Sequence, residues 1–394
     1  MTDKTRWGAV AALILAGGVV ALQIGKAAIA VPALQHDLSL SLVVASWVIG
    51  AYGMLGAVGG LPAGIAASLF SARRTLIAGL ITAGIGSLAG AFVTSGELLI
   101  ATRVIEGCGF LAAVLALPRL LRIVTAPKDR DTVFAFWGAY MPLGSVIMMV
   151  AGPHLIAFGW QTMWIVNGIV ALAYAALIAF LPVQEEAVAP NPGQSLLPNI
   201  RAALGTPGPA LLALAFGIYT FQYSAMANLL PTLLVDRMGL SVAAAGSISA
   251  VTVAANAIGN IFAGALLRLG AALWATLAFG FCFVGFASFG VFSEHLPVIV
   301  IAALASASLA ITGFIPASIF AAAPRMAHSS ALLSIVLGLV NQVSNLGNLV
   351  GPPTTGAVVQ SFGWERTPYL FVGVMVSGLI VALLLRTMMN DAKT

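Results

Sequence analysis

Residues 98–113 read LLIATRVIEGCGFLAA, an apolar run that carries Arg103 and Glu106 three positions apart. A charged side chain at the centre of a membrane-spanning helix costs about 2.5 kcal/mol or more. Residues at positions i and i+3 lie on one face of a helix. We therefore expect Arg103 and Glu106 to face a partner, a water-filled cavity or a solute, with the rest of the chain forming the walls.

The composition predicts a membrane protein with many spans. Of the 394 residues, 60% are hydrophobic and 7% are charged, whereas a soluble protein carries about 25% charged residues. The N-terminal apolar stretch runs to Ala33 without the cleavage pattern of a signal peptide, so we interpret it as a first spanning helix. Cys108 and Cys282 lie within apolar runs and indicate no disulfide framework.

Twelve apolar segments approach the length of about 20 residues that a bilayer span requires. They cover 7–33, 43–68, 75–95, 98–122, 132–157, 161–182, 207–235, 242–268, 271–292, 296–322, 330–360 and 367–387. We predict an all-α polytopic membrane protein, with twelve transmembrane helices in two pseudo-symmetric six-helix bundles. The first bundle is predicted at 1–183, a Pro- and Gly-rich cytoplasmic linker at 184–206, and the second bundle at 207–394.

The two halves of the chain repeat each other. Several markers share an offset of 199 residues: Pro32 and Pro231, Asp37 and Asp236, and Gly152-Pro153 and Gly351-Pro352. An even number of spans lets the second copy run parallel to the first. Parallel halves related by an axis along the membrane normal are a known transporter architecture.

Basic residues predict the orientation in the membrane. With the N-terminus inside, the cytoplasmic segments hold thirteen of them: Lys4, Arg6, Arg73, Arg74, Arg119, Arg122, Lys128, Arg130, Arg201, Arg268, Arg325, Arg386 and Lys393. The outer loops hold only Arg237 and Arg366. This excess predicts that both termini are cytoplasmic. We expect a bacterial inner-membrane protein.

Local motifs add a family resemblance. Residues 103–109 read RVIEGCG, residues 159–167 read GWQTMWIVN, and residues 346–353 read LGNLVGPP. These stretches resemble motif B, the start of helix six and a Gly-Pro gating helix of the major facilitator superfamily. The segment 64–74 occupies the place of motif A, but has Ser68 where an Asp is usual.

The resemblance covers essentially the whole chain and implies a secondary transporter that works by alternating access. Pro118, the loop 71–74 and Trp137-Gly138 loosely resemble the cyanate and nitroimidazole permeases. The drug/proton antiporters share the motif B text. The resemblance therefore leaves the subfamily open.

One carboxylate is available for proton coupling, because Glu106 is the only acid placed inside a predicted span. Lys26, Arg103 and Glu106 lie about 8–12 Å below the outer ends of their helices at 1.5 Å per residue. We expect Glu106 to pair with Lys26 or Arg103 and to act with Arg103 in proton coupling. The surplus positive charge favours an anionic or carboxylate-bearing substrate in contact with Lys26 or Arg103. Two alternatives stay open: a purely structural pair, and a Lys26 side chain that snorkels to the surface.

The second half offers uncharged polar side chains within its spans. The candidate substrate contacts there are Gln222, Tyr223, Asn341 and Asn345. Amides also hydrogen-bond between membrane helices, at roughly 0.6 kcal/mol each. Such a stripe can therefore be helix packing alone.

Basic, proline and glycine residues are the candidates for gating. They are Arg73, Arg74, Pro142, Gly144, Gly152, Pro153, Gly351 and Pro352. Proline removes a backbone hydrogen bond and kinks a helix. The matched positions in the two halves favour a rocking motion.

Four functions compete. The leading one is proton-coupled transport of a small anionic or zwitterionic organic solute, and the second is a proton-driven multidrug exporter. An intramembrane enzyme is disfavoured, since the chain has no His-Glu-x-x-His and no Gly-x-Ser-x-Gly. A non-transporting receptor would normally add a soluble signalling domain. We therefore expect no enzymatic activity, no cofactor, no metal and no nucleic-acid partner. The expected partners are the solute, protons and the lipid bilayer, and the expected state is a monomer.

Overall fold

The computed structural model describes residues 4–60, 70–181, 205, 207–326 and 330–391. In the N-terminal half these residues form α1 (Trp7–Asp37), the span Leu42–Gly60 with α2 (Leu42–Gly50) and η1 (Ala51–Gly53), α4 (Ala72–Gly90), α5 (Gly96–Val124), η2 (Pro127–Asp129), α6 (Arg130–Gly138) with α7 (Tyr140–Ile156), and α8 (Trp160–Phe180). The C-terminal half contains α10 (Pro207–Asp236), α11 (Val242–Arg268), α12 (Leu273–Val291), α13 (Val298–Thr312) with α14 (Phe314–Met326), α15 (Ser330–Phe362), η3 (Trp364–Arg366) and α16 (Thr367–Asp391).

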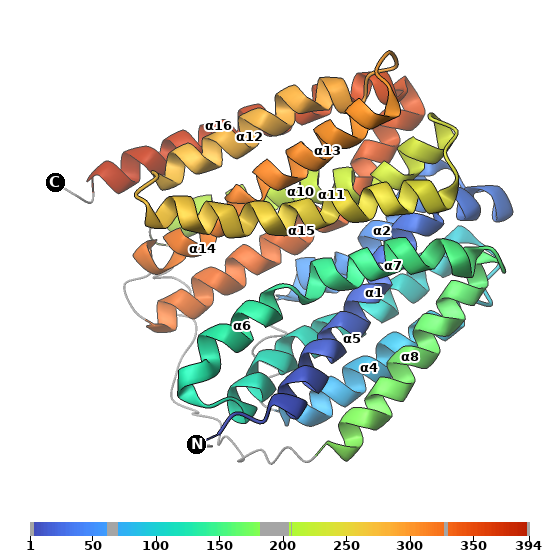
Figure 1. Ribbon diagram of the computed structural model, residues 1–394, viewed down its shortest axis with the longest axis horizontal. Helices are drawn as coiled ribbons and strands as arrows, with labels where there is room; N and C mark the ends of the chain where they lie inside the picture. Colours follow the sequence, from blue (N-terminus) through green and yellow to red (C-terminus); the bar gives the residue numbers. More distant parts are fainter. Residues whose placement is uncertain (1–3, 61–69, 182–204, 206, 327–329, 392–394) are drawn as a thin grey trace.

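These elements are the predicted fold: twelve helical units arranged as two six-helix bundles (Figure 1). Among the described residues, nine helices are long and apolar enough to cross a membrane, and ten if α6 and α7 are one bent span. Helix α4 carries Arg73 and Arg74 in its first turn, which lower its hydropathy. The boundaries of the predicted linker stay predictions, because 184–206 lies outside the described residues except for residue 205.

Serine caps and left-handed glycines start the matching helices of the two halves. Ser41 accepts a hydrogen bond from the backbone N–H of Val44 at 3.3 Å, and Ser241 accepts one from Ala244 at 3.3 Å. Such caps satisfy N–H groups that the first turn leaves free. Gly159 and Gly363 have φ values of +96° and +79°, which favour glycine, and each precedes a tryptophan that opens the next helical segment.

The two halves meet along α2 with α15, α7 with α11, and α1 with α10. Both termini lie on the same side of the view in Figure 1. Gly50 packs so closely on the carbonyl oxygen of Leu349 that a Cβ there would collide with it, and Gly246 packs in the same way on Met149. These contacts join the last residue of α2 to the second half of α15, and the second turn of α11 to the second half of α7.

Proline explains why carbonyl groups are available at both contacts. Pro353 and Pro153 have no N–H, so the carbonyls of Leu349 and Met149, four residues earlier, receive no helical hydrogen bond from them. Helix α15 nevertheless continues through its prolines to Phe362. At each crossing, a glycine of one half therefore meets a carbonyl that a proline has freed in the other half.

Candidate functional site

Helix α5 brings Arg103 and Glu106 to one buried face, where α1 adds Lys26. Lys26 Nζ lies 3.0 Å from Glu106 Oε1, and Arg103 Nη1 pairs with Glu106 Oε2. All three side chains are 0% exposed. The expected pairing of Glu106 is confirmed for both cations. We call these three residues the charged trio.

The trio is enclosed by helices of the N-terminal half. Lys26 Nζ donates to Ser87 Oγ at 2.7 Å and lies 4.5 Å from the ring centre of Trp164. The Ser87 hydroxyl donates in turn to the carbonyl oxygen of Trp164 at 2.7 Å. The expectation that Lys26 could snorkel outward is wrong, because its side chain is fully buried between α4, α5 and α8.

Arg103 is held in a similar way. Its Nε donates to the carbonyl oxygen of Val48 at 3.0 Å, and its guanidinium lies 4.6 Å from the ring centre of Tyr52. The Tyr52 hydroxyl donates to the carbonyl oxygen of Val20 at 2.7 Å. Arg103 Nη2 makes no hydrogen bond to a described residue. Two cations thus share one carboxylate, and the trio carries one surplus positive charge.

The predicted contacts of the second half lie in different surroundings. Asn345 packs in the contact between α15 and the span Leu42–Gly60, where its side chain lies against Gly56. Gln222 is 0% exposed, and Tyr223 lies 5.6 Å from Tyr219 between ring centres. Asn341 lines a pocket of the C-terminal half. The structure does not gather these residues around Lys26 and Arg103, so a shared substrate contact stays a prediction.

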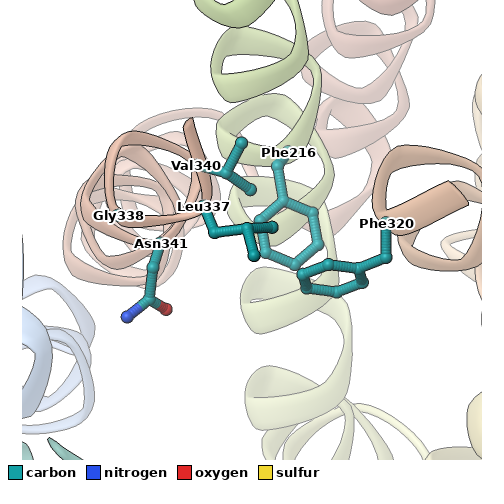
Figure 2. A pocket seen from close by; sticks show the side chains of 6 residues that line it. All are labelled: Phe216, Phe320, Leu337, Gly338, Val340 and Asn341. Atoms are coloured by element: carbon teal, nitrogen blue, oxygen red, sulfur yellow. The ribbon is translucent and has the colours of Figure 1, made fainter. Parts of the chain in front are cut away.

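The pocket has a volume of about 330 Å³. It is lined by Phe216 of α10, Phe320 of α14, and Leu337, Gly338, Val340 and Asn341 of α15. Figure 2 shows the two phenylalanine rings close together and the Asn341 amide directed away from them. Of its six lining residues, the sequence predicted only Asn341.

Gln23 is a buried polar residue that the sequence analysis did not single out. It is 0% exposed, and neither its amide nitrogen nor its oxygen makes a hydrogen bond to a described residue. The same holds for Gln222, which lies 199 residues later. The repeat offset would have paired these two residues from the sequence alone.

The candidate gating arginines lie at the start of α4. Arg73 donates from Nε to the carbonyl oxygen of Ile178 at 3.3 Å and from Nη2 to that of Ala179, which links α4 to α8. Arg74 is exposed. Their gating role stays a prediction, and Ser68 lies outside the described residues.

The helix-breaking candidates pack helices together. Helices α6 and α7 meet at a bend of 42°, and Pro142 falls in the first turn of α7, where a missing N–H is tolerated. Gly144 and Gly152 pack α7 against α1, since a Cβ on either would lie within 3 Å of α1 atoms. Gly351 packs α15 against the carbonyl of Phe221 on α10 in the same way.

Comparison with known proteins supports the fold and the transport function. The profile of the Major Facilitator Superfamily matches residues 13–344. The 3-(3-hydroxy-phenyl)propionate transporter of Escherichia coli is 27% identical over 373 residues, covering 92% of this chain and 90% of the relative. The hexuronate transporter of Bacillus subtilis is 24% identical over 404 residues, covering 95% and 92%.

Two further matches extend this comparison. The puromycin resistance protein pur8 of Streptomyces alboniger is 32% identical over 175 residues, covering 43% of this chain and 34% of the relative. A bacterial homologue of the human lysosomal transporter Spinster, in an inward-facing and occupied conformation, has the same fold, with a TM-score of 0.75, 17% identity, and coverage of 98% and 96%. The chain is a transport protein without enzymatic activity, embedded in a membrane, and it belongs to the Major Facilitator Superfamily.

Proposed function

We propose that this transporter moves a small organic anion or zwitterion by alternating access and couples that movement to protons. The charged trio is the observation that carries the proposal, because it puts one carboxylate between two cations inside the membrane. Burying charges is costly, and buried ion pairs often add little to the stability of a fold. A role in transport gives a reason to retain it.

Protonation of Glu106 is the step that would couple the two movements. A proton on this carboxylate cancels the counter-charge of both Lys26 and Arg103, which then carry two unbalanced positive charges. In a low-dielectric interior, unbalanced charges act over longer distances than in water. Proton binding would therefore raise the affinity for an anion, and anion binding would raise the affinity for the proton by the same factor. This reciprocity favours symport.

Two of the relatives are named for organic anions, a substituted propionate and a hexuronate. Both names denote carboxylates, the chemistry that the surplus charge of the trio favours. We propose contacts to the solute from Lys26 and Arg103 in the first half. In the second half, the proposed contacts are Gln222, Tyr223, Asn341 and Asn345.

We also propose a bacterial inner membrane as the location, with cytoplasmic termini and a monomer as the working unit. The excess of basic residues in the predicted cytoplasmic segments supports the orientation. The contacts at Gly50 and Gly246 join the two halves in this conformation. Rocking of the halves would open these contacts, with Arg73 and Arg74 closing the inner side.

A proton-driven exporter of small drug-like molecules is the second candidate. The observation that favours it is the apolar pocket of Phe216 and Phe320, which has no charged lining residue. The relative named for puromycin resistance supports the same alternative. The two candidates differ in the charge of the solute and in the direction of net transport.

The test is uptake into proteoliposomes with an imposed proton gradient, using wild-type protein and Glu106→Gln. The glutamine keeps the size and the hydrogen-bonding oxygen of Glu106 but cannot carry the proton. The solutes are 3-phenylpropionate, hexanoate and a cationic dye. Thr387→Ala, at an exposed hydroxyl near the end of α16, is the matched control.

We expect wild type and the control to accumulate a carboxylate down the proton gradient, and Glu106→Gln to lose that accumulation. Counterflow, the exchange of labelled for unlabelled solute without a gradient, should persist in Glu106→Gln. Accumulation that survives the substitution would refute proton coupling through Glu106. Gradient-driven movement of the dye without the acids would favour the exporter.

A further inference from the structure

The apolar pocket has the chemistry of a site for one aromatic ring. Its walls are two phenylalanine rings, two aliphatic side chains, a glycine and one amide. The ring centres of Phe216 and Phe320 are 5.5 Å apart with an interplanar angle of 72°, an edge-to-face arrangement. Aromatic pairs prefer this geometry or offset stacking to a face-to-face sandwich. A third ring would find both a face and an edge in this pocket.

Phe216 is held in place from behind. Phe216 stacks on Tyr219, with ring centres 5.6 Å apart and an interplanar angle of 18°. The Tyr219 hydroxyl donates to Asn256 Oδ1 at 3.2 Å, and Asn256 Nδ2 donates to the carbonyl oxygen of Leu309 at 2.8 Å. The hydrogen bonds anchor Tyr219 to α11 and α13. A wall held in place before binding loses little conformational entropy when a ligand arrives.

The pocket has room for an aromatic group. An apolar cavity of about 150 Å³ is enough to bind benzene. The pocket of about 330 Å³ is therefore large enough for a six-membered ring with a short substituent. No lining residue carries a charge, so an ionised group has no partner within the pocket. A charged group of the same ligand must lie outside it.

The open edge of the pocket gives the ligand its direction. Asn341 is exposed at this edge, and Figure 2 shows its amide directed away from the rings. An amide there can donate a hydrogen bond to an oxygen on the ligand.

We propose that this pocket is the subsite for an aromatic ring of the transported solute, and that the solute is a single-ring aryl carboxylate with its carboxylate outside the pocket. The carboxylate part rests on the proposed function above, whereas the ring part rests on the pocket alone. Phe216 and Phe320 bind the ring, and Asn341 contacts an oxygen of the ligand at the edge.

The test measures binding to the purified full chain by calorimetry with three probes. They are 3-phenylpropionate, hexanoate, which lacks a ring, and 3-phenyl-1-propanol, which lacks the charge. The variants are Phe320→Ala and Phe216→Ala. Phe320 is 51% exposed, so its loss should leave the fold intact. Phe286→Ala, at a 71% exposed phenylalanine of α12 outside the pocket, is the control.

We expect wild type to bind 3-phenylpropionate more tightly than hexanoate. Phe320→Ala and Phe216→Ala should weaken 3-phenylpropionate binding about tenfold, the order expected for a lost aromatic contact. Hexanoate binding should stay within about twofold of wild type, a difference well below the loss of one aromatic contact. Equal affinity of wild type for the two acids, or an equal loss of both in the variants, would overturn the aryl subsite.

The neutral probe separates this inference from the proposed function. If wild type binds 3-phenyl-1-propanol but neither acid, and Phe320→Ala weakens that binding, the ring subsite stands and the anionic substrate is wrong. If wild type binds both acids and Phe320→Ala weakens neither, the anionic substrate stands and the ring subsite is wrong. Phe320→Ala provides this answer even if Phe216→Ala unfolds.

Discussion

The two halves of the molecule place different chemistry at equivalent positions. The repeat offset is 199 residues between α1 and α10, and 202 residues between the starts of α5 and α13, from Gly96 to Val298. The equivalent pairs are Lys26 and Ala225, Arg103 and Ala305, and Glu106 and Ser308. The charged trio of the first half therefore corresponds to two alanines and a serine in the second.

The uncharged positions of the second half show that these helices can pack without buried charges. Ala225 is 1% exposed, and Ala305 and Ser308 are 0% exposed, so α10 and α13 pack closely without any charge. The same helix arrangement is thus reached without a buried ion pair. The second half instead carries the aromatic pocket. This contrast supports the proposal that the charges of the trio serve transport and not helix packing.

The largest expected effect comes from removing the only negative charge of the trio. Glu106→Leu leaves Lys26 and Arg103 buried without a counter-charge, and breaking a buried pair costs about 3–5 kcal/mol. We expect a large fall in the free energy of unfolding, measured by thermal or denaturant unfolding in detergent.

A triple variant breaks the comparison more completely. This variant combines Lys26→Met, Arg103→Met and Glu106→Leu. It removes the buried charges, so that these positions become uncharged like their equivalents in the second half. Replacing a whole buried ion group by apolar residues of similar volume is often neutral or stabilising. We expect this variant to fold better than Glu106→Leu and to show no proton-driven uptake. Uptake at the wild-type rate would show that the charges serve neither proton nor solute.

A third prediction concerns the contacts that the halves form with each other. Gly246→Ala forces a methyl group against the carbonyl oxygen of Met149, and Gly50→Ala does the same at Leu349. Overpacking costs about 1–3 kcal/mol in the conformation that contains the contact. We expect each variant to shift the population away from this conformation by about fivefold or more, at 1.4 kcal/mol per factor of ten. Spin-label distances across the α7–α11 contact would measure the shift.

The same helices provide matched controls. A Cβ on Gly264 of α11, or on Gly59 of the second span, would meet no atom within 4 Å. Gly264→Ala and Gly59→Ala should leave the spin-label distances unchanged. If Gly246→Ala also leaves them unchanged, the glycine contact with the Met149 carbonyl does not hold the two halves together.

The fold was largely predictable because hydropathy and repeat offsets are local properties of the sequence. The twelve units, the pairing of Glu106 and the match between Pro153 and Pro352 follow from spacing alone. The site was less predictable, because its walls come from distant segments. Nothing around Phe216 or Phe320 indicates that α10 and α14 place the two rings 5.5 Å apart. The glycine contacts were missed for the same reason, since Gly50 and Leu349 are neighbours only after folding.

The smallest expected effect concerns the matched amides Gln23 and Gln222. Neither side chain makes a hydrogen bond to a described residue, and a buried polar group without a partner costs about 1–3 kcal/mol. Gln23→Leu and Gln222→Leu should therefore raise the free energy of unfolding by about 1 kcal/mol, seen as a higher midpoint of thermal unfolding in detergent.

A third glutamine supplies the opposite sign and so tests the comparison between the halves. Gln342 on α15 donates from its amide to the carbonyl oxygen of Ala57 at 3.2 Å, and Gln342→Leu should lower the unfolding midpoint. If Gln23→Leu lowers it as well, its amide has a partner and the equivalence of the two halves fails at this position. If Gln23→Leu and Gln222→Leu raise the midpoint while solute uptake falls, both halves keep a costly amide because the solute binds to it during transport.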